Sequence, residues 1–307
     1  MAYAGGGLRR IRHIMEFAAA RIFLFVIARL PLPASSALCR FLAGLYRLIA
    51  GKRRRIAETQ AAEILGLSPA GARELIKRNF RHYGLVMAEA AQLSRLCRKD
   101  FSEHLDLAGL DVLANRLFAE GRGIILVTAH FGNWEWGGSG FSCLSERPGC
   151  CIARPFDNPL VYGLVKNLRG KNGLRIFDKQ GALRQALRAL KNNEYLAILM
   201  DQDAGRDGLG SPFLGRPAST VTEPVKLALR TGSPLVPVVL RRREGAARRF
   251  VMRYNPVPRR ADPAARPEAE IRRLVDLLNA DLSRLILEAP EQWFWVHRRW
   301  KNPGRIR

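Results

Sequence analysis

Four short apolar segments, separated by stretches of helical periodicity, constrain the fold of this chain more than any other feature. The apolar segments occupy residues 123–129, 149–153, 195–200 and 235–240. Helical stretches lie between and after them, at residues 134–144, 159–168, 182–190 and 223–230. Strands that alternate with helices in this way form parallel sheets covered by helices. We therefore predict an α/β protein with a mainly parallel sheet.

Further elements extend the pattern at both ends. Apolar residues at helical spacing predict a helix over residues 68–95, with Ser68 and Pro69 at its start. Another helix is expected at 110–120, a strand at 249–254 and a final helix at 268–287. The simplest organisation is a helical, membrane-associated N-terminal segment, residues 1–67, followed by one α/β domain. That domain covers residues 68–307 and includes the last helix and a tail rich in Trp and Arg.

Polar residues follow three of the predicted strands. His130 comes just after the first strand, Arg154 just after the second and Asp201 just after the third. In open α/β sheets, ligands collect outside the carboxyl ends of the strands. We therefore expect these three residues to share one rim of the sheet and to form a single site.

His130 is also followed, five positions later, by Glu135, with the turn formers Gly132 and Asn133 between them. On an unbroken helix, five positions of about 100° each would turn the two side chains apart. If the strand stops at His130 and a turn leads into a helix, they can meet. A neutral imidazole held by a carboxylate can take a proton from a hydroxyl near pH 7. The alternative is a hydrogen-bonded histidine at a strand boundary.

The block Thr128–Glu135 resembles the His-x4-Asp/Glu motif of lysophospholipid-type acyltransferases. Further similar blocks follow in order: Arg154–Pro159, Leu199–Asp203, Pro212–Thr220 and Pro290–Lys301. From about residue 73 onward, the chain thus resembles the lipid A biosynthesis (lauroyl/myristoyl) acyltransferases, one branch of that group. Residues 201–205 depart from the Pro-Glu-Gly-Thr-Arg type block that glycerol-phosphate acyltransferases usually carry. This departure favours a bulky glycolipid acceptor.

The resemblance implies transfer of a fatty acyl chain from acyl carrier protein to a hydroxyl of a (Kdo)-lipid A precursor. It implies no cofactor beyond acyl-ACP or acyl-CoA as co-substrate, and a site at the inner (cytoplasmic) membrane that faces the cytoplasm. His130 would be the general base, and Glu135 would accept a bond from its far ring nitrogen. One alternative is an acyl-CoA-dependent acyltransferase of another glycolipid, such as a phosphatidylinositol mannoside. The non-enzyme alternative is a basic protein that binds a membrane surface or nucleic acid.

Other residues are candidates for binding the reacting groups. Arg154, with the amides around Gly132 and Asn133, is a candidate to stabilise the oxyanion. Asp201 and Gln202 are expected to contact the acceptor, and a purely structural turn is the alternative. Neighbouring carboxylates can bind hard cations, but no further acidic residues stand at ligand spacing, so we predict no metal site.

The C-terminal tail carries a second candidate group. Arg298 and Arg299 stand beside several tryptophans, and this combination suits phosphate recognition at headgroup depth. The alternative is a tail that packs onto the domain through its tryptophans. Asn158 is a predicted turn or helix-cap residue rather than a ligand.

The net charge of +24 narrows the possible partners. Such a field attracts nucleic acid, an anionic membrane surface, or an acidic substrate or carrier. We find no zinc-finger spacing, RNA-recognition signature or basic helix with heptads. The apolar N-terminus, the interfacial aromatics and the phosphorylated glycolipid that the resemblance implies favour an anionic inner-membrane surface over nucleic acid. The 5 cysteines form no Cys-x-x-Cys pair, which argues against a disulfide framework and fits a reducing compartment.

The N-terminus combines a basic flank with an interrupted apolar stretch. Arginines at 9, 10 and 12 precede residues 17–28, and Arg21 interrupts that stretch before the break at 31–33. A spanning helix needs about twenty apolar residues. We therefore predict an interfacial or anchoring helix, with its basic flank on the cytoplasmic side, rather than a signal peptide.

Overall fold

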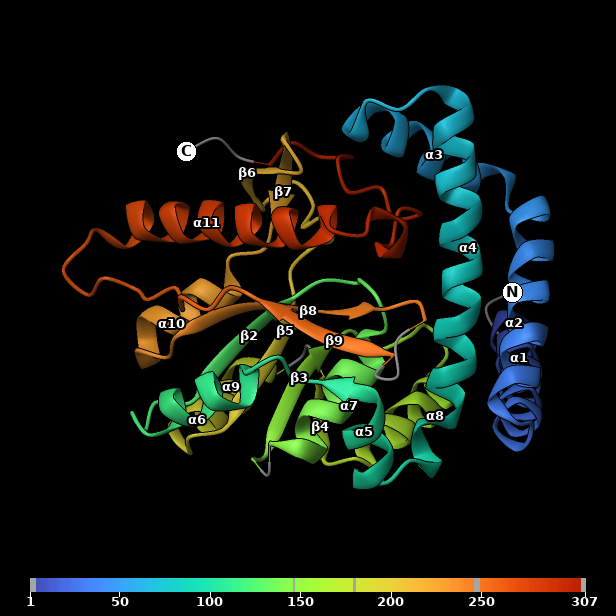
Figure 1. Cartoon of the computed structure of the whole chain (residues 1–307), viewed down its shortest axis with the longest axis horizontal. Helices are drawn as coiled ribbons and strands as arrows, with labels where there is room; N and C mark the ends of the chain where they lie inside the picture. The colour runs from blue at the N-terminus through green and yellow to red at the C-terminus, as the bar shows by residue number, and fades with distance from the viewer. Residues whose placement is uncertain (1–3, 146, 179–180, 246–248, 305–307) are drawn as a thin grey trace.

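The computed structural model describes residues 4–145, 147–178, 181–245 and 249–304 (Figure 1). Within these residues a seven-stranded sheet forms the centre of the protein. Its strands, in spatial order, are β1 (Leu105–Asp106), β9 (Phe250–Tyr254), β8 (Leu235–Arg242), β2 (Ile124–Thr128), β5 (Tyr195–Leu199), β3 (Gly149–Ala153) and β4 (Leu174–Asp178). The β8–β9 pair is antiparallel, and the other neighbours are parallel. The predicted mainly parallel α/β sheet is confirmed.

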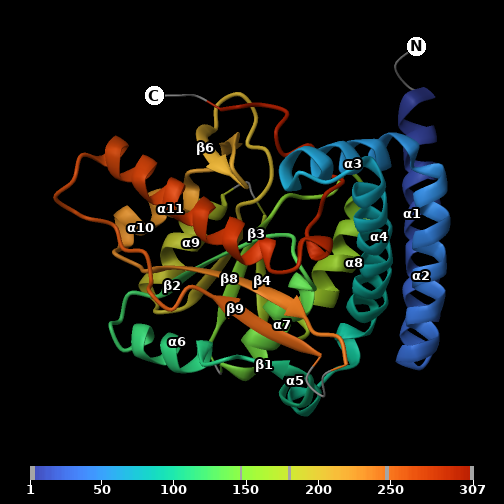
Figure 2. The same cartoon turned by 45° about the horizontal axis from the view of Figure 1, so that its top comes forward.

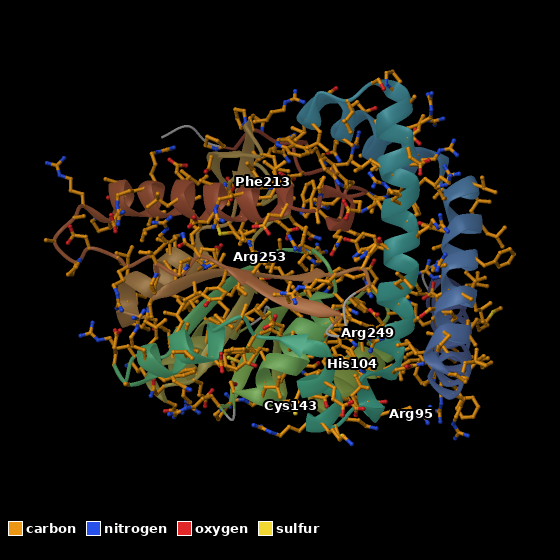
Figure 3. All side chains as sticks on the ribbon, viewed as in Figure 1. Arg95, His104, Cys143, Phe213, Arg249 and Arg253 are labelled. Carbon is orange, nitrogen blue, oxygen red and sulfur yellow. The ribbon has the colours of Figure 1, made fainter. Side chains whose placement is uncertain are left out.

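Helices cover both faces of this sheet (Figures 1 and 2). One face carries α9 (Ala182–Lys191), α10 (Glu223–Thr231) and α11 (Pro267–Leu287). The other carries α5 (Arg98–His104), α6 (Leu110–Phe118) and α7 (Trp134–Leu144), and α8 (Pro159–Gly170) packs beside β4. The sheet separates two apolar cores, because Ile125 and Val127 point to the α11 side whereas Ile124 and Leu126 point to the α7 side. Phe213 and His104, labelled in Figure 3, lie on these opposite sides.

From residue 68 onward, the predicted strands and helices are confirmed with ends that differ by at most three residues, and some elements were not predicted. The elements that were not predicted are β1, β4, α5, the hairpin of β6 (Leu209–Phe213) and β7 (Arg216–Thr220), and the short helix η2 (Pro290–Gln292), whereas the predicted helix over residues 68–95 ends in the short helix η1 (Leu93–Arg95). Prolines at 212 and 217 argue against strands from sequence, but here they face each other in a two-stranded hairpin outside the main sheet.

Four helices form a layer at one end of the molecule, at the right of Figure 1. They are α1 (Ala4–Arg29), α2 (Leu32–Ile49), α3 (Gly51–Leu65) and α4 (Pro69–Gln92). Ser68 caps α4, as predicted, by accepting a bond from the Gly71 amide at 3.1 Å. α2 and α3 were not predicted individually, and the break at residues 31–33 proves to be the start of α2. The predicted boundary between residues 67 and 68 stays a prediction, and the outermost residues, 1–3 and 305–307, lie outside the described part.

The outer side of α1 and α2 is unusually apolar for a protein surface. Its large exposed side chains recur at helical spacing: Leu8, Ile11, Met15, Ile22, Phe25, Leu38, Phe41, Leu45 and Ile49. Arginines occur on the same two helices, at 9, 10, 12, 21, 29, 40 and 47. Across the described residues, no helix combines the length and the apolar character that a membrane span requires.

Candidate active site

The carboxyl ends of three adjacent strands converge on one cavity. His130 follows β2, Asp201 follows β5 and Arg154 follows β3, and β5 lies between the other two strands. The cavity has a volume of about 1500 Å³ and is lined by His130, Arg154, Glu135 and Gln202, among others. The expected common rim is therefore present, and Asp201 lies buried just beneath it.

Asp201 holds the imidazole of His130. The Nδ1 atom of His130 lies 2.9 Å from Asp201 Oδ1, and the backbone amide of His130 donates to Oδ2 at 2.9 Å. The indole Nε1 of Trp293 also donates to Oδ2 at 2.9 Å. The side chain of Asp201 is 2% exposed and that of His130 is 20% exposed, so the ring reaches the cavity while the carboxylate does not.

The surroundings of Asp201 keep its carboxyl group ionised. Burial raises the pKa of Asp201, but the attraction of His130 and the three bonds from His130 and Trp293 offset this and hold the pKa below its ordinary value. An ionised carboxylate can only accept hydrogen bonds, so Nδ1 of His130 carries the proton. In the neutral ring, Nε2 is then the basic nitrogen.

Glu135 does not hold His130, and this part of the sequence prediction is wrong. Its carboxylate lies in the first turn of α7 and faces Arg169 of α8, whose Nε donates at 2.7 Å and whose Nη2 donates to the other oxygen. The Trp134 indole donates to Glu135 at 3.1 Å. The imidazole meets the end of the neighbouring strand β5 instead, where Asp201 stands. Glu135 and Arg169 nevertheless both line the cavity.

Gly132 and Asn133 shape the turn after β2; the expected oxyanion role is contradicted for the Gly132 amide and stays a prediction for the Asn133 amide. Gly132 has a φ of 59°, and a Cβ built there would come 1.6 Å from the carbonyl oxygen of Leu240. Its amide already donates to the Gln292 carbonyl at 3.0 Å. Asn133 is fully buried, caps α7 by accepting from the Trp136 amide at 3.2 Å, and donates to Glu89 at 2.7 Å. The structure thus explains both residues as parts of the strand-to-helix turn.

Two residues of α4 hold this turn by hydrogen bonds to its backbone carbonyls. Nε2 of His82 lies 3.1 Å from the carbonyl oxygen of Gly132, and the Tyr83 hydroxyl donates to the carbonyl of His130 at 3.1 Å. Burial, together with the charge of Arg242, lowers the pKa of His82 to about 3, although its bond to Gly132 acts in the opposite direction. His82 is therefore neutral and donates from Nε2.

Arg154 and Asn158 lie on the loop between β3 and α8. Arg154 is exposed and lines the cavity, so its expected role at the oxyanion stays a prediction. Asn158 is confirmed as a cap: its oxygen accepts from the amides of Leu160 and Val161 at 3.0 and 3.3 Å. Its Nδ2 donates to the His13 carbonyl and to Glu16 of α1, at 2.9 and 2.8 Å.

The C-terminal tail packs onto the domain, which was the alternative interpretation. Trp293 and Trp295 are fully buried. Arg299 is also fully buried, donates to the Gln202 carbonyl at 3.2 Å and to Thr220 Oγ1 at 2.7 Å, and lies over the Phe213 ring. Burial lowers the pKa of Arg299 to about 10. Arg299 therefore supports the loop after Asp201 and is not available to a phosphate, whereas Arg298 is exposed.

Sequence reasoning missed the residues that form hydrogen bonds to the site residues. Asp201 was assigned to the acceptor rather than to His130, although its place after an apolar strand was a usable signal. Arg169 and Trp293 gave no such signal, because their contacts join segments far apart in sequence. Among the described residues, no group of three or more His, Cys, Asp and Glu side chains is placed to hold a metal ion. The cysteines of this part, which include Cys151 in the cavity wall, are free thiols.

Fold and site together define an α/β enzyme in which a histidine–aspartate pair faces an open cavity and can activate a hydroxyl. Comparison with known families makes the class specific. Residues 6–302 match the family described as bacterial lipid A biosynthesis acyltransferase, and the chain belongs to this family. It is therefore an acyltransferase, which confirms the resemblance seen in its motifs and sets aside the non-enzyme alternative.

Individual relatives share about a quarter of the aligned residues. The chain is 28% identical to a lipid A biosynthesis lauroyltransferase of Escherichia coli (strain K12), over 77% of this chain and 74% of the relative. It is 26% identical to a lipid A biosynthesis palmitoleoyltransferase of the same strain, over 91% and 89% of the two chains. A phosphatidylinositol mannoside acyltransferase of Mycobacterium tuberculosis (strain CDC 1551 / Oshkosh) is 28% identical over 57% of each chain.

Proposed function

We propose that this acyltransferase moves a fatty acyl chain from an acyl carrier protein thioester to a hydroxyl of a (Kdo)-lipid A precursor. The observation that carries the proposal is the His130–Asp201 pair at the wall of a large cavity. Two relatives named for lipid A biosynthesis align with most of the chain, which favours this acceptor.

The chemistry follows from the protonation state of the pair. Nε2 of His130 takes the proton of the acceptor hydroxyl as its oxygen attacks the thioester carbonyl. The negative charge of Asp201 stabilises the imidazolium that forms. When the tetrahedral intermediate collapses, the carbon–sulfur bond breaks and the imidazolium returns the proton to the departing thiolate. The products are an ester and a free thiol, and general-base action of this kind contributes about a hundredfold to ten-thousandfold.

The other cavity residues have supporting roles in this proposal. Arg154 stabilises the oxyanion from the exposed end of β3. Glu135 and Arg169 form an ion pair in the cavity wall, beside the reacting hydroxyl. Gln202 contacts the acceptor. The reaction requires neither a cofactor nor a metal ion.

We further propose that α1 and α2 lie on the anionic surface of the inner membrane, with the site facing the cytoplasm. Exposed apolar patches of this extent on a protein surface mark interaction sites. Arginines on the same helices complement anionic headgroups, and apolar side chains beside basic ones are typical of helices that lie in the interface.

Purified protein, assayed with two donors and two acceptors, tests the proposal. The donors are acyl carrier protein and coenzyme A thioesters of one fatty acid, and the acceptors are the lipid A precursor and a phosphatidylinositol mannoside. We expect the fastest transfer from acyl carrier protein to the lipid A precursor, and a loss of at least about a hundredfold in His130→Ala. The second candidate function, supported by the mycobacterial relative, predicts the other combination of substrates. Full activity of His130→Ala would falsify the mechanism.

A further inference from the structure

α9 presents a row of basic side chains to solvent. Arg184, Arg188 and Lys191 follow one another at steps of four and three residues, so they share one face of the helix, and all three are exposed. The opposite face is buried in the core on the α11 side of the sheet, through Ala182, Ala186, Ala189 and Leu190. α9 contains no acidic residue, so its exposed face is purely positive.

α10 extends this positive face across to the neighbouring helix. It contacts α9 on the same side of the sheet, and its exposed Lys226 and Arg230 lie one turn apart. Glu223 is the single acidic residue of the two helices. Within the part of the chain that the structure describes, no ion pair neutralises the basic residues of this face. We call them the α9–α10 basic surface: Arg184, Arg188, Lys191, Lys226 and Arg230.

The first turns of both helices reach the cavity of His130. Ala182 and Leu183 at the start of α9 line this cavity, as do Glu223 and Lys226 at the start of α10. α9 follows β4, so it begins at the edge of the sheet where the carboxyl ends of the strands meet. The α9–α10 basic surface therefore begins at the rim of the cavity. A partner that is bound there can reach His130 with a flexible arm.

The basic surface lies away from the helices that we propose meet the membrane. In both views, α10 lies at the end of the molecule opposite to α1 and α2 (Figures 1 and 2). The part of the cavity rim nearer to α1 is the loop before α8, where Phe156 lines the cavity and is 46% exposed. Asn158 in the same loop donates to α1. A lipid acceptor and a partner at α9 and α10 thus approach the cavity from different sides, which favours a soluble anionic partner over lipid.

We propose that the α9–α10 basic surface docks the acyl carrier protein, whose prosthetic arm enters the cavity beside Leu183 and Lys226 and brings the thioester to His130. The carrier is acidic and holds its acyl group on a long flexible arm, so its charge and its reach fit this surface. Opposite charges on two proteins speed their encounter and fix their orientation. Leu183, 48% exposed among these charges, adds an apolar contact of the kind that interfaces bury at their centre. The proposal rests on the proposed function, which makes acyl carrier protein the donor.

Steady-state kinetics with two donors test the docking surface. The full-length enzyme receives one acyl group either on acyl carrier protein or on pantetheine, a small thioester that lacks the carrier. The double variant Arg184→Glu/Arg188→Glu should raise the KM for the carrier about tenfold, with kcat within about twofold of wild type, because two attractions become repulsions. The KM for acyl-pantetheine should stay unchanged. Added salt should slow transfer from the carrier more in wild type than in the variant.

Two matched controls accompany this variant. Arg184→Lys/Arg188→Lys keeps both charges and should keep the wild-type KM. Arg81→Glu/Arg116→Glu reverses two exposed charges on α4 and α6, which do not line the cavity, and should also leave the KM unchanged. Arg188→Glu/Arg230→Glu reverses one charge on each helix and serves if the first variant does not fold. A wild-type KM in a folded variant of the surface, or an equal rise for acyl-pantetheine or in Arg81→Glu/Arg116→Glu, would overturn the docking surface.

A binding measurement separates this proposal from the proposed function. Fluorescently labelled acyl carrier protein is titrated with wild type and with Arg184→Glu/Arg188→Glu, and we expect the Kd to rise about tenfold in the variant. If the carrier binds through this surface but no acyl group reaches the lipid A precursor, the docking surface stands and the proposed reaction fails. If the carrier binds both proteins equally, the docking surface is wrong even where transfer occurs. A variant that loses binding to anionic vesicles instead would assign the surface to the membrane and overturn the proposal.

Discussion

Asp201 fixes more than the tautomer of His130. One of its oxygens bonds the imidazole, and the other accepts from the backbone amide of the same histidine and from the Trp293 indole. A single buried carboxylate therefore orients both the ring and the backbone turn that carries it. His82 and Tyr83 hold the turn from the opposite side, through the carbonyls of Gly132 and His130. The imidazole is thus fixed on both sides before substrate arrives, which is what general-base catalysis requires.

Because His82 is buried as a neutral ring, the free energy of unfolding depends on pH. Its pKa falls from about 6.5 in the unfolded chain to about 3 in the fold. The unfolded chain takes up the proton first, so stability is full above about pH 6.5 and falls by up to about 1.4 kcal/mol per pH unit on the way to pH 3. His82→Gln retains a donor toward Gly132 but does not titrate in this window. The free energy of unfolding in urea, compared at pH 7 and pH 5, should drop less in His82→Gln than in wild type, and equal drops would contradict this assignment.

At the scale of elements, strand order decides which carboxylate reaches His130. β5 is the direct neighbour of β2, so the residues just after these strands are brought together across a parallel pair. Sequence periodicity locates strand ends well, and His130, Arg154 and Asp201 were all placed correctly on one rim. It does not reveal which strands are neighbours. Sequence reasoning therefore paired the histidine with Glu135, five residues away, although it had already placed Asp201 on the same rim.

Two other differences from the sequence prediction have causes of their own. β4 is an edge strand with the sequence Leu174-Arg-Ile-Phe-Asp178. Its residues do not form the continuous apolar run that marks the central strands. The sequence of the C-terminal tail allowed two interpretations, because buried tryptophans and membrane-facing tryptophans cannot be told apart from sequence. Burial of Trp295 and Arg299 decides between them.

α8 connects α1 to the cavity through Asn158, and this link can be tested with a paired substitution. Asn158→Asp keeps the helix cap but loses the Nδ2 donor and faces Glu16 with a second carboxylate. We expect faster amide hydrogen exchange around residue 13 of α1. Adding Glu16→Gln restores a donor and should restore protection. Protection that is unchanged in Asn158→Asp, or that is not recovered in the double variant, would show that this contact does not hold α1.

At the scale of the whole molecule, the apolar face of α1 and α2 is the side that we propose meets the membrane. The face lies at one end of the protein, on the helices farthest from the sheet (Figures 1 and 2). The charge of +24 adds a long-range attraction to anionic lipid and to an acidic carrier. In the proposed function, the apolar face of α1 and α2 places the enzyme at the membrane, and the net positive charge favours its encounter with an acidic donor.

Vesicle binding tests this orientation. Phe25 and Phe41 are 58% and 63% exposed on α1 and α2. Replacing both by Glu should reduce co-sedimentation with anionic vesicles by more than about tenfold, because two buried rings are lost from the bilayer. Val112→Glu, at a site 70% exposed on α6, is the matched control and should bind as wild type does. Equal binding by all three proteins would contradict a docking role for α1 and α2.

The most direct test of the account is the rate of acyl transfer to the lipid A precursor in Asp201→Asn compared with Glu135→Gln. Both substitutions replace a carboxylate by an amide of the same shape, and circular dichroism verifies that both proteins are folded. If Asp201 orients His130, Asp201→Asn loses at least about a hundredfold in kcat, because an uncharged amide cannot stabilise the imidazolium. Glu135→Gln, whose carboxylate faces Arg169, loses less. A near wild-type rate in Asp201→Asn, with the large loss in Glu135→Gln instead, would contradict the account.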